Sequence, residues 1–487
     1  MSPPPSPQEL VQKVMSGARW VAAIRLSAQT LSWLSTIIVV RFISPGDYGL
    51  NSMLEAPMEL MMLLSTLGLD VALVQSRKLE KDQFQSAFGW LLAINFLLFL
   101  AYFFGGALLA NYFNEPRLES LAKVLSVVFI LAPFRAIPNA LLDRELKFKS
   151  RAIVDLVAVI TGASTTLILA VYGAGVWALV LGLILNRLVT AILLMVLHPW
   201  FVRPTLGPAA VQMIALGGVV ALSGALLMLS GTLVSLIAGP ALGAHSLGIY
   251  AVAMQFALLP LSKFMPVINP IIFPAFSRLQ GHPEQAGYYL DRALSFASIF
   301  LFPVMIGLAC VASDFVGVVL GDKWAEAALP LALISLAMPF RMVTNFVRPV
   351  MNGMGRPDLN LKSSALMLAV LLPVIPLAMG YGVMGLAIVW LLVEPVIAYA
   401  TLVMSKKVIG ISIAQMARNL LPPVTASAVM AAAIFLLKLN ANLDTGVAEL
   451  FLQVATGALA YVMTLWLFFR PQLIKAANLL LDRKNVA

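Results

Sequence analysis

Two apolar segments near the start of the chain are joined by the turn SPGDYGL, residues 44–50. About 200 residues later the turn LGAHSLGIY, residues 242–250, again joins two apolar segments. Two further stretches return in the same order: APFR at 132–135 resembles MPFR at 338–341, and YGAGVWA at 172–178 resembles YGVMGLA at 381–387. Three similarities in one order, at a spacing of roughly 200 residues, indicate an internal repeat of the fold.

Apolar runs long enough to cross a bilayer, about 20 residues each, fill the chain between these turns. Hydropathy, with breaks at charged or Gly/Pro clusters, predicts about fourteen transmembrane helices. The predicted spans are 17–42, 49–69, 84–112, 118–141, 152–172, 176–197, 211–238, 248–276, 289–311, 325–351, 360–379, 383–404, 413–437 and 447–469. Of the 487 residues, 61% are hydrophobic and 11% are charged. Soluble domains carry roughly a quarter charged residues, so this composition excludes a large soluble domain.

Each repeat holds about six of these helices, and two helices remain at the C-terminal end. An even number of helices preserves orientation, so the two halves are related by an axis along the membrane normal. We therefore expect an all-α membrane protein with two pseudo-symmetric six-helix lobes, 1–205 and 206–407, followed by two helices in 408–470 and a cytoplasmic tail at 471–487. Two such lobes are typical of secondary transporters, and the alternative is a duplicated membrane protein of another function, such as an enzyme.

Basic residues gather in loops of one parity, including 77–81, 144–151 and 406–407. Loops of the other parity hold few: Arg41, Arg117, Lys323 and Lys438. Because basic loops stay in the cytoplasm, both termini are predicted to be cytoplasmic. The net charge of +10 is then mostly a topological signal, and we expect no nucleic acid partner.

Charges inside the predicted spans are rare, and each costs roughly 2.5–3.5 kcal/mol at the bilayer centre on insertion scales. Arg135 and Arg341 stand at matching places in the two repeats, each directly after Pro-Phe. If the lobes face each other, both arginines face one central cavity, where their guanidinium groups can bind a phosphate or pyrophosphate through paired hydrogen bonds. The further candidates for anion binding are Arg25, Arg187 and Arg348.

Two alternatives stay open for these arginines. Each can pair with a carboxylate such as Glu55 or with backbone carbonyls beside the proline, and Arg187 can extend toward the cytoplasmic surface. Carboxylates in the spans are candidates for coupling transport to protons: Glu55, Glu59, Asp155 and Glu394. Glu55 and Glu59 share one helix face because they are four residues apart. Salt bridges to the arginines are the alternative role for these carboxylates.

Six motifs between residues 41 and 324 carry a family resemblance: RFISPGDYGL at 41–50, LGLDVALVQ at 67–75, PNALLDRELKF at 138–148, GAGVWAL at 173–179, FPAFSR at 273–278 and VLGDKW at 319–324. On these motifs the chain resembles Wzx-type oligosaccharide flippases of the multidrug/oligosaccharidyl-lipid/polysaccharide (MOP) superfamily, on the exopolysaccharide branch. It departs from the usual pattern at Gly46, where an acidic residue often precedes Asp47.

The resemblance implies a multi-pass protein of a bacterial inner membrane that moves undecaprenyl-pyrophosphate-linked repeat units to the periplasmic leaflet for exopolysaccharide synthesis. Together with the arginines it predicts alternating access through an arginine-lined central cavity. We expect a transporter and not an enzyme, with no cofactor or metal. The expected partners are the lipid-linked oligosaccharide and membrane lipids, a polysaccharide polymerase is left open, and the carrier is expected to be a monomer.

Three alternatives compete with this interpretation. A lipid II-type flippase is close in fold and chemistry. A cation-coupled multidrug exporter of the same superfamily would need acidic residues where this chain has arginines. A membrane glycosyltransferase or polymerase would need a large soluble loop, whereas the longest predicted loop is about 15 residues, close to ordinary connection lengths.

Overall fold

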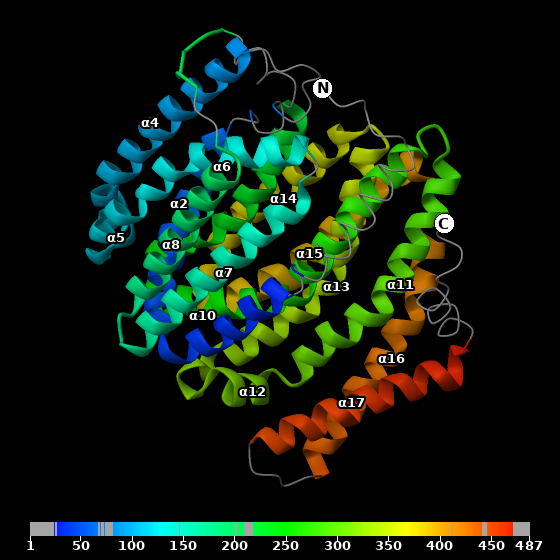
Figure 1. Ribbon diagram of the computed structural model, residues 1–487. Coiled ribbons are helices and arrows are strands. Elements are labelled where there is room, and N and C mark those ends of the chain that lie inside the picture. The colour runs from blue at the N-terminus through cyan, green and yellow to red at the C-terminus, as the bar shows by residue number, and fades with distance from the viewer. Residues whose placement is uncertain are drawn as a thin grey trace. The chain divides into compact units, whose positions relative to one another are not determined.

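The described part of the chain is almost entirely helical (Figure 1). A computed structural model describes residues 24, 27–66, 69, 73, 81–145, 147–199, 202–208, 218–410, 412–440 and 446–470. These residues include no strand, and ten helical stretches among them are long and apolar enough to cross a membrane. The prediction of an all-α multi-pass membrane protein is confirmed.

The chain forms two compact units, Met1–Gly248 and Ile249–Ala487. In the first unit residues 27–42 are helical. They are followed by α2 (Pro45–Thr66), α4 (Lys81–Phe113), α5 (Arg117–Leu125), α6 (Val127–Arg144), α7 (Phe148–Val171) and α8 (Val176–Leu197). Helix α10 (Gly218–Ser277) begins in this unit and is interrupted at Gly243, whose φ of 75° and ψ of 172° are not helical. The predicted lobe boundary at 205/206 is a different division and stays a prediction.

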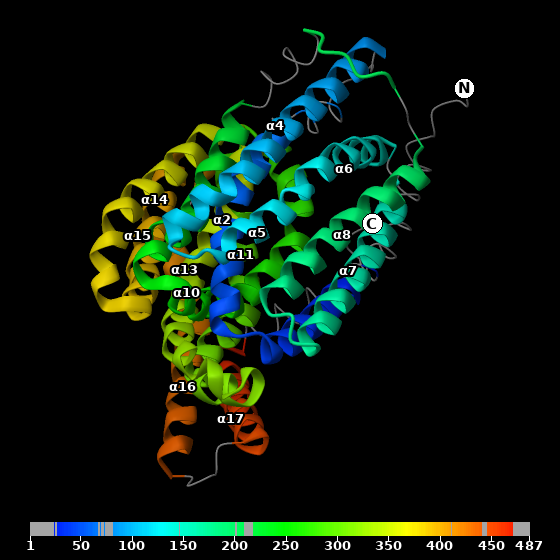
Figure 2. The ribbon, with the colours of Figure 1, turned by 90° about the vertical axis from the view of Figure 1, so that its left-hand side faces the viewer.

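The second unit begins within α10 and continues with α11 (Pro283–Cys310) and three short elements, α12 (Ala312–Phe315), η2 (Val316–Leu320) and η3 (Asp322–Ala327). Its remaining helices are α13 (Ala328–Gly353), α14 (Pro357–Ala378), η4 (Met379–Tyr381), α15 (Gly382–Ile409), α16 (Ile413–Asn440) and α17 (Val447–Phe468). Helix α13 packs against α11 and α15, and α16 packs against α11 and α17. The last two helices lie side by side in both views (Figures 1 and 2).

The two PFR motifs lie at equivalent places in helices of equivalent position. Pro133 is inside α6 and Pro339 is inside α13, and each helix carries a second proline further along. Each proline removes one backbone hydrogen bond from its helix, which makes a local bend there. Arg135 and Arg341 therefore follow the same kind of helix irregularity in the two units.

The two turns that define the repeat pack against each other. A Cβ atom added to Gly49 would lie 1.7 Å from the carbonyl oxygen of Ala244, and one added to Gly248 would lie 1.7 Å from that of Pro45. Aligning Gly49 with Gly248 also aligns Pro45 with Ala244, so the same contact occurs twice, once in each direction. Small residues permit such backbone approach between membrane helices. The crossing of α2 and α10 therefore depends on glycine at both positions.

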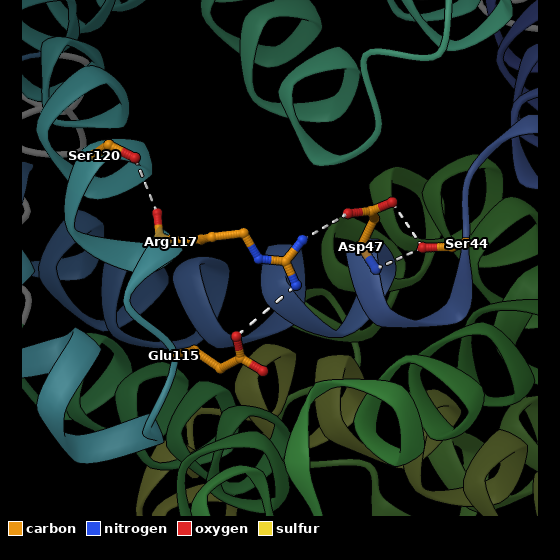
Figure 3. Close-up of polar contacts among 5 residues, drawn as sticks. All are labelled: Ser44, Asp47, Glu115, Arg117 and Ser120. Atoms are coloured by element: carbon orange, nitrogen blue, oxygen red, sulfur yellow. Dashed lines mark hydrogen bonds and ion pairs between the residues drawn. The ribbon is translucent and has the colours of Figure 1, made fainter.

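The SPGD turn also contacts two other loops of the first unit, and Figure 3 shows its contact with the loop that contains Arg117. Ser44 Oγ donates to Asp47 Oδ2 over 2.7 Å and accepts from the Asp47 backbone N–H over 3.2 Å, which caps the start of α2. Arg117 Nη1 lies 3.6 Å from Asp47 Oδ1. Asp47 also lies against Gly175, which precedes α8 with a φ of +56°. A Cβ atom added to Gly46 would have Ser44 Oγ as its nearest neighbour at 3.9 Å. There is therefore room for a side chain at this position, where the family often has an acidic residue.

The segment 202–208 is fixed on helix α4. The Thr205 backbone N–H donates to the Gln85 carbonyl over 3.1 Å. Ser86 Oγ and Trp90 Nε1 both donate to the Gly207 carbonyl, over 2.6 and 3.1 Å. The chain that leaves α8 is therefore held against the first unit at the place where the sequence predicted the lobe boundary.

Replacing Gly248 with alanine tests the crossing of α2 and α10. Its new methyl group would overlap the Pro45 carbonyl, so we expect a loss of about 1–3 kcal/mol in stability, typical of an overpacked site. The midpoint of thermal unfolding in detergent measures the loss. Gly231→Ala is the control, since that glycine is on the same helix with no atom within 4 Å of an added Cβ. Equal stability of the two variants would contradict the close contact.

Candidate functional site

The second unit brings three of the predicted site residues together. Arg341 Nη1 on α13 donates to Glu394 Oε1 on α15 over 3.2 Å. Glu394 is 1% exposed and the Arg341 side chain is 19% exposed, so the carboxylate of this pair is buried and the guanidinium is partly buried. Arg348 is seven residues after Arg341, about two helical turns, and therefore lies on the same side of α13. Its charge interacts with both Glu394 and Arg341.

Two aromatic residues hold Arg341 from another direction. Its guanidinium carbon lies 5.1 Å from the centre of the Trp390 ring, within the range of a cation–π interaction. Trp390 Nε1 in turn donates to the Tyr250 hydroxyl over 2.7 Å, and both aromatic side chains are buried. Arg341 is thus fixed by a carboxylate and by a hydrogen-bonded aromatic pair.

The first unit brings together a different set of charges. Arg135 on α6 lies close enough to Arg187 on α8 for their charges to repel, and Asp155 on α7 attracts Arg135. Glu55 on α2 attracts Arg187. The Nε atoms of Arg135 and Arg187 are buried and have no hydrogen-bond partner among the residues that the structure describes. The same is true of Arg348 Nε in the second unit.

Close packing of α7 against α8 sets the position of Arg187. A Cβ atom added to Gly162 would lie 2.8 Å from the Cβ of Asn186, and one added to Gly182 would lie 1.8 Å from Thr166 Oγ1. The two helices lie side by side in both views (Figures 1 and 2). Glycine on each helix therefore brings the backbone next to Arg187 against the helix that carries Asp155.

The acidic candidates have unequal surroundings. Glu55 is partly buried, forms a side-chain hydrogen bond with Asn51, and feels the charges of Glu59 and Arg187. Asp155 is exposed, whereas Glu394 is buried against two arginines. Arg25 lies outside the described residues. The binding and coupling roles of all these residues stay predictions.

Sequence reasoning did not identify Trp390 and Tyr250 as parts of the site. A signal for Trp390 was present, because it precedes Glu394 by four residues and so lies on the same face of α15. Tyr250 is far from α15 in sequence and carried no such signal. In the repeat, Tyr250 follows the turn at 242–249 and its counterpart in the first half is Asn51, which is not aromatic.

Comparisons with known proteins give one family. Residues 38–329 match the family model described as polysaccharide biosynthesis protein. The chain is 26% identical over 417 residues to the lipopolysaccharide biosynthesis protein WzxC of Escherichia coli (strain K12), covering 83% of this chain and 84% of the relative. It is 24% identical to the succinoglycan biosynthesis transport protein ExoT of Rhizobium meliloti (strain 1021), covering 72% and 71%.

Among solved structures, the fold is similar to that of the lipid II flippase MurJ in an inward closed conformation. The TM-score is 0.77 and the sequence identity 16%, covering 93% of this chain and 99% of the other. At this identity the likeness concerns the fold.

Removing one partner of the buried Arg341–Glu394 pair tests its structural weight. Arg341→Met and Glu394→Leu each leave one charge of the pair without its partner, and we expect each to lose roughly 3–5 kcal/mol in stability. The double variant Arg341→Met with Glu394→Leu is expected to lose clearly less than the two single losses combined. Thermal unfolding in detergent measures all three. Glu119→Ala, which breaks an exposed pair with Lys123, is the control and should change stability by under about 1 kcal/mol. Additive losses would show that Arg341 and Glu394 are not coupled.

Proposed function

The chain belongs to the polysaccharide biosynthesis protein family, and we propose that it flips undecaprenyl-pyrophosphate-linked oligosaccharide repeat units across a bacterial inner membrane for exopolysaccharide synthesis. Membership of this family makes it a polysaccharide-biosynthesis transporter and not an enzyme. The transport named for ExoT and the lipid-linked cargo named for MurJ both support this cargo class. The proposed direction is from the cytoplasmic to the periplasmic leaflet.

The observation that carries the proposal is the set of guanidinium groups inside the apolar helices. The lipid tail of such a cargo can stay in the bilayer, so only pyrophosphate and sugars must cross. Moving an isolated charge through hydrocarbon without compensation costs many kcal/mol. Arg135 and Arg187 in the first unit, and Arg341 and Arg348 in the second, supply charges that replace part of the lost hydration. Arg25 is proposed as a further member of this set.

We propose fourteen transmembrane helices, arranged as two six-helix lobes and a C-terminal pair, that work by alternating access. The ten candidate spans support this number, because Leu222–Pro266 and Pro357–Ile409 have 45 and 53 residues, each enough for two crossings. The first contains the break at Gly243 and the second the short helix η4. Helix α2 and the helix containing residues 27–42 supply the last two.

A lipid II-type cargo is the second candidate, supported by the likeness to MurJ. It differs from the first candidate in its sugars and not in its pyrophosphate, so the arginines serve both. A cation-coupled drug exporter would not use them. For coupling we propose proton transfer at Glu55, Glu59, Asp155 or Glu394, and a response of transport to a pH gradient would support it.

Replacing Arg135 and Arg341 together with alanine tests the proposed cargo. In a strain that lacks the native flippase, we expect the double variant to block polymer export and to leave lipid-linked saccharide in the cytoplasmic leaflet. Membrane immunoblots measure the amount of the variant, because loss of Arg341 leaves Glu394 without its partner, and export is compared at equal amounts of protein. Arg203→Ala is the matched control, because that arginine is exposed outside the helices. Full export by the double variant would exclude a role for these arginines.

Cysteine labelling tests the topology. After Cys310 is replaced with serine, single cysteines at Lys147 and Lys323 should react with impermeant reagents from opposite sides of the membrane. Both positions are exposed in loops or at helix ends, so labelling should be efficient. With both termini cytoplasmic, Lys147 lies on the cytoplasmic side. Labelling of both from one side would rule out the proposed helix count.

A further inference from the structure

We infer that the anionic group of the cargo binds at the Arg135–Arg187 pair of the first unit, and that Arg341, the repeat counterpart of Arg135, is a positioning residue held by Glu394. This inference rests on the proposed function and says which of the arginines take the pyrophosphate. The first unit then holds the anion site, and the second unit holds a closed ion pair at the equivalent place.

Arg341 already has a carboxylate partner. It donates to Glu394 over 3.2 Å and lies over the Trp390 ring, which is itself fixed to the Tyr250 hydroxyl. The side chain of Glu394 is 2% exposed. An anion that took Arg341 from Glu394 would compete with a buried carboxylate and leave it with less positive charge, which is unfavourable in a low-dielectric interior.

Arg135 is in the opposite situation. Among the charges that act on it, the strongest effect is that of Arg187, which is repulsive. The Nε atoms of both residues are buried and unbonded within the part of the chain that the structure describes. Two guanidinium groups held close together in a low-dielectric environment repel strongly, and an anion between them removes that repulsion. Pyrophosphate suits such a pair, since each arginine can donate two parallel hydrogen bonds to its oxygens.

The repeat matches the helices that supply these neighbours. Aligning Tyr172 with Tyr381 pairs α8 with α15 and places Glu394 opposite Leu185. Arg187 is two residues further, about half a helical turn, so it does not occupy the position of Glu394. Helix α15 supplies a carboxylate to Arg341, whereas α8 supplies a guanidinium near Arg135. The arginine after Pro-Phe is thus present in both units, but the charge that comes from the counterpart helix has the opposite sign.

Glu55 is the group that the cargo would displace. It attracts Arg187, as Glu394 attracts Arg341, but its surroundings are weaker. Glu394 is attracted by Arg341 and Arg348, whereas Glu55 also feels the like charge of Glu59. Glu55 comes from α2, which is separate from the helices of both arginines. A carboxylate that is repelled by its neighbour is more easily replaced than one held by two arginines.

Binding of geranylgeranyl pyrophosphate to the purified protein in nanodiscs tests the assignment. Geranylgeraniol, which has the tail without the phosphates, is the ligand control. We expect Arg135→Gln and Arg187→Gln each to weaken binding tenfold or more, and the corresponding lysine variants to keep part of the affinity because they keep the charge. Glu55→Gln should bind several-fold more tightly, since it no longer competes for Arg187.

Arg341→Gln should behave differently. We expect a lower midpoint of thermal unfolding and an affinity within threefold of the wild type. Adding Glu394→Gln should restore the midpoint, because it removes the carboxylate that lost its partner. A large loss of affinity in Arg341→Gln, with wild-type affinity in both Arg135→Gln and Arg187→Gln, would overturn the inference. Unchanged or weaker binding by Glu55→Gln would overturn the displacement of Glu55.

These outcomes are separable from the proposed function. Wild-type protein that binds the pyrophosphate probe at Arg135 and Arg187, but whose deletion leaves no lipid-linked saccharide behind, would retain the anion site and lose the proposed cargo. Wild-type protein that exports polymer normally but binds the probe through Arg341 would retain the cargo and lose the inference. Failure of the wild type to bind the probe better than geranylgeraniol would overturn the inference.

Discussion

Hydrocarbon offers no hydrogen bonds, and the rest of this structure follows from that constraint. Every backbone amide in a bilayer must find its partner inside the protein, which leaves helices as the available form for a chain of this composition. Every charge in the bilayer needs a counterion or a functional role, because its desolvation is costly. The described residues meet the first requirement with continuous helices and short turns. Each unit holds one cluster of arginines and carboxylates, and other charges of the helices have partners of their own, such as Lys438 with Asp314.

Helices in lipid also lack the hydrophobic force that assembles a soluble core, so packing depends on close contact between backbones. The contacts of Gly49 and Gly248 with the opposite carbonyl groups are an extreme case, and Gly162 with Gly182 gives a second one. The second contact bears on the proposed anion site because, next to Arg187, it brings α8 close to α7. A wider spacing between α7 and α8 would move Arg187 away from the helix that carries Asp155.

The apolar runs were sufficient to predict an all-α multi-pass membrane protein, because a segment that crosses a bilayer must be long and uncharged. Hydropathy does not locate short helical turns next to a span. Val316–Leu320 is a π-helix and Asp322–Ala327 a 3-10 helix, so α13 begins at Ala328, whereas the predicted span 325–351 began three residues earlier. The repeat identified Arg135 and Arg341 as counterparts. It could not identify their partners, because Glu394 and Arg187 come from other helices. Sequence similarity between the two repeats does not require the neighbouring residues to carry the same charge.

The different partners matter because a carrier must distinguish a loaded state from an empty one. A ligand shifts a conformational equilibrium only by its difference in affinity for the two states. An arginine that always has its carboxylate gains little when an anion arrives, and so contributes little to that difference. Two arginines that repel each other gain most from the anion, and the gain disappears when the anion leaves. An arginine pair with a weakly held carboxylate nearby therefore suits an element whose state must depend on cargo, and a closed ion pair suits one that must stay fixed.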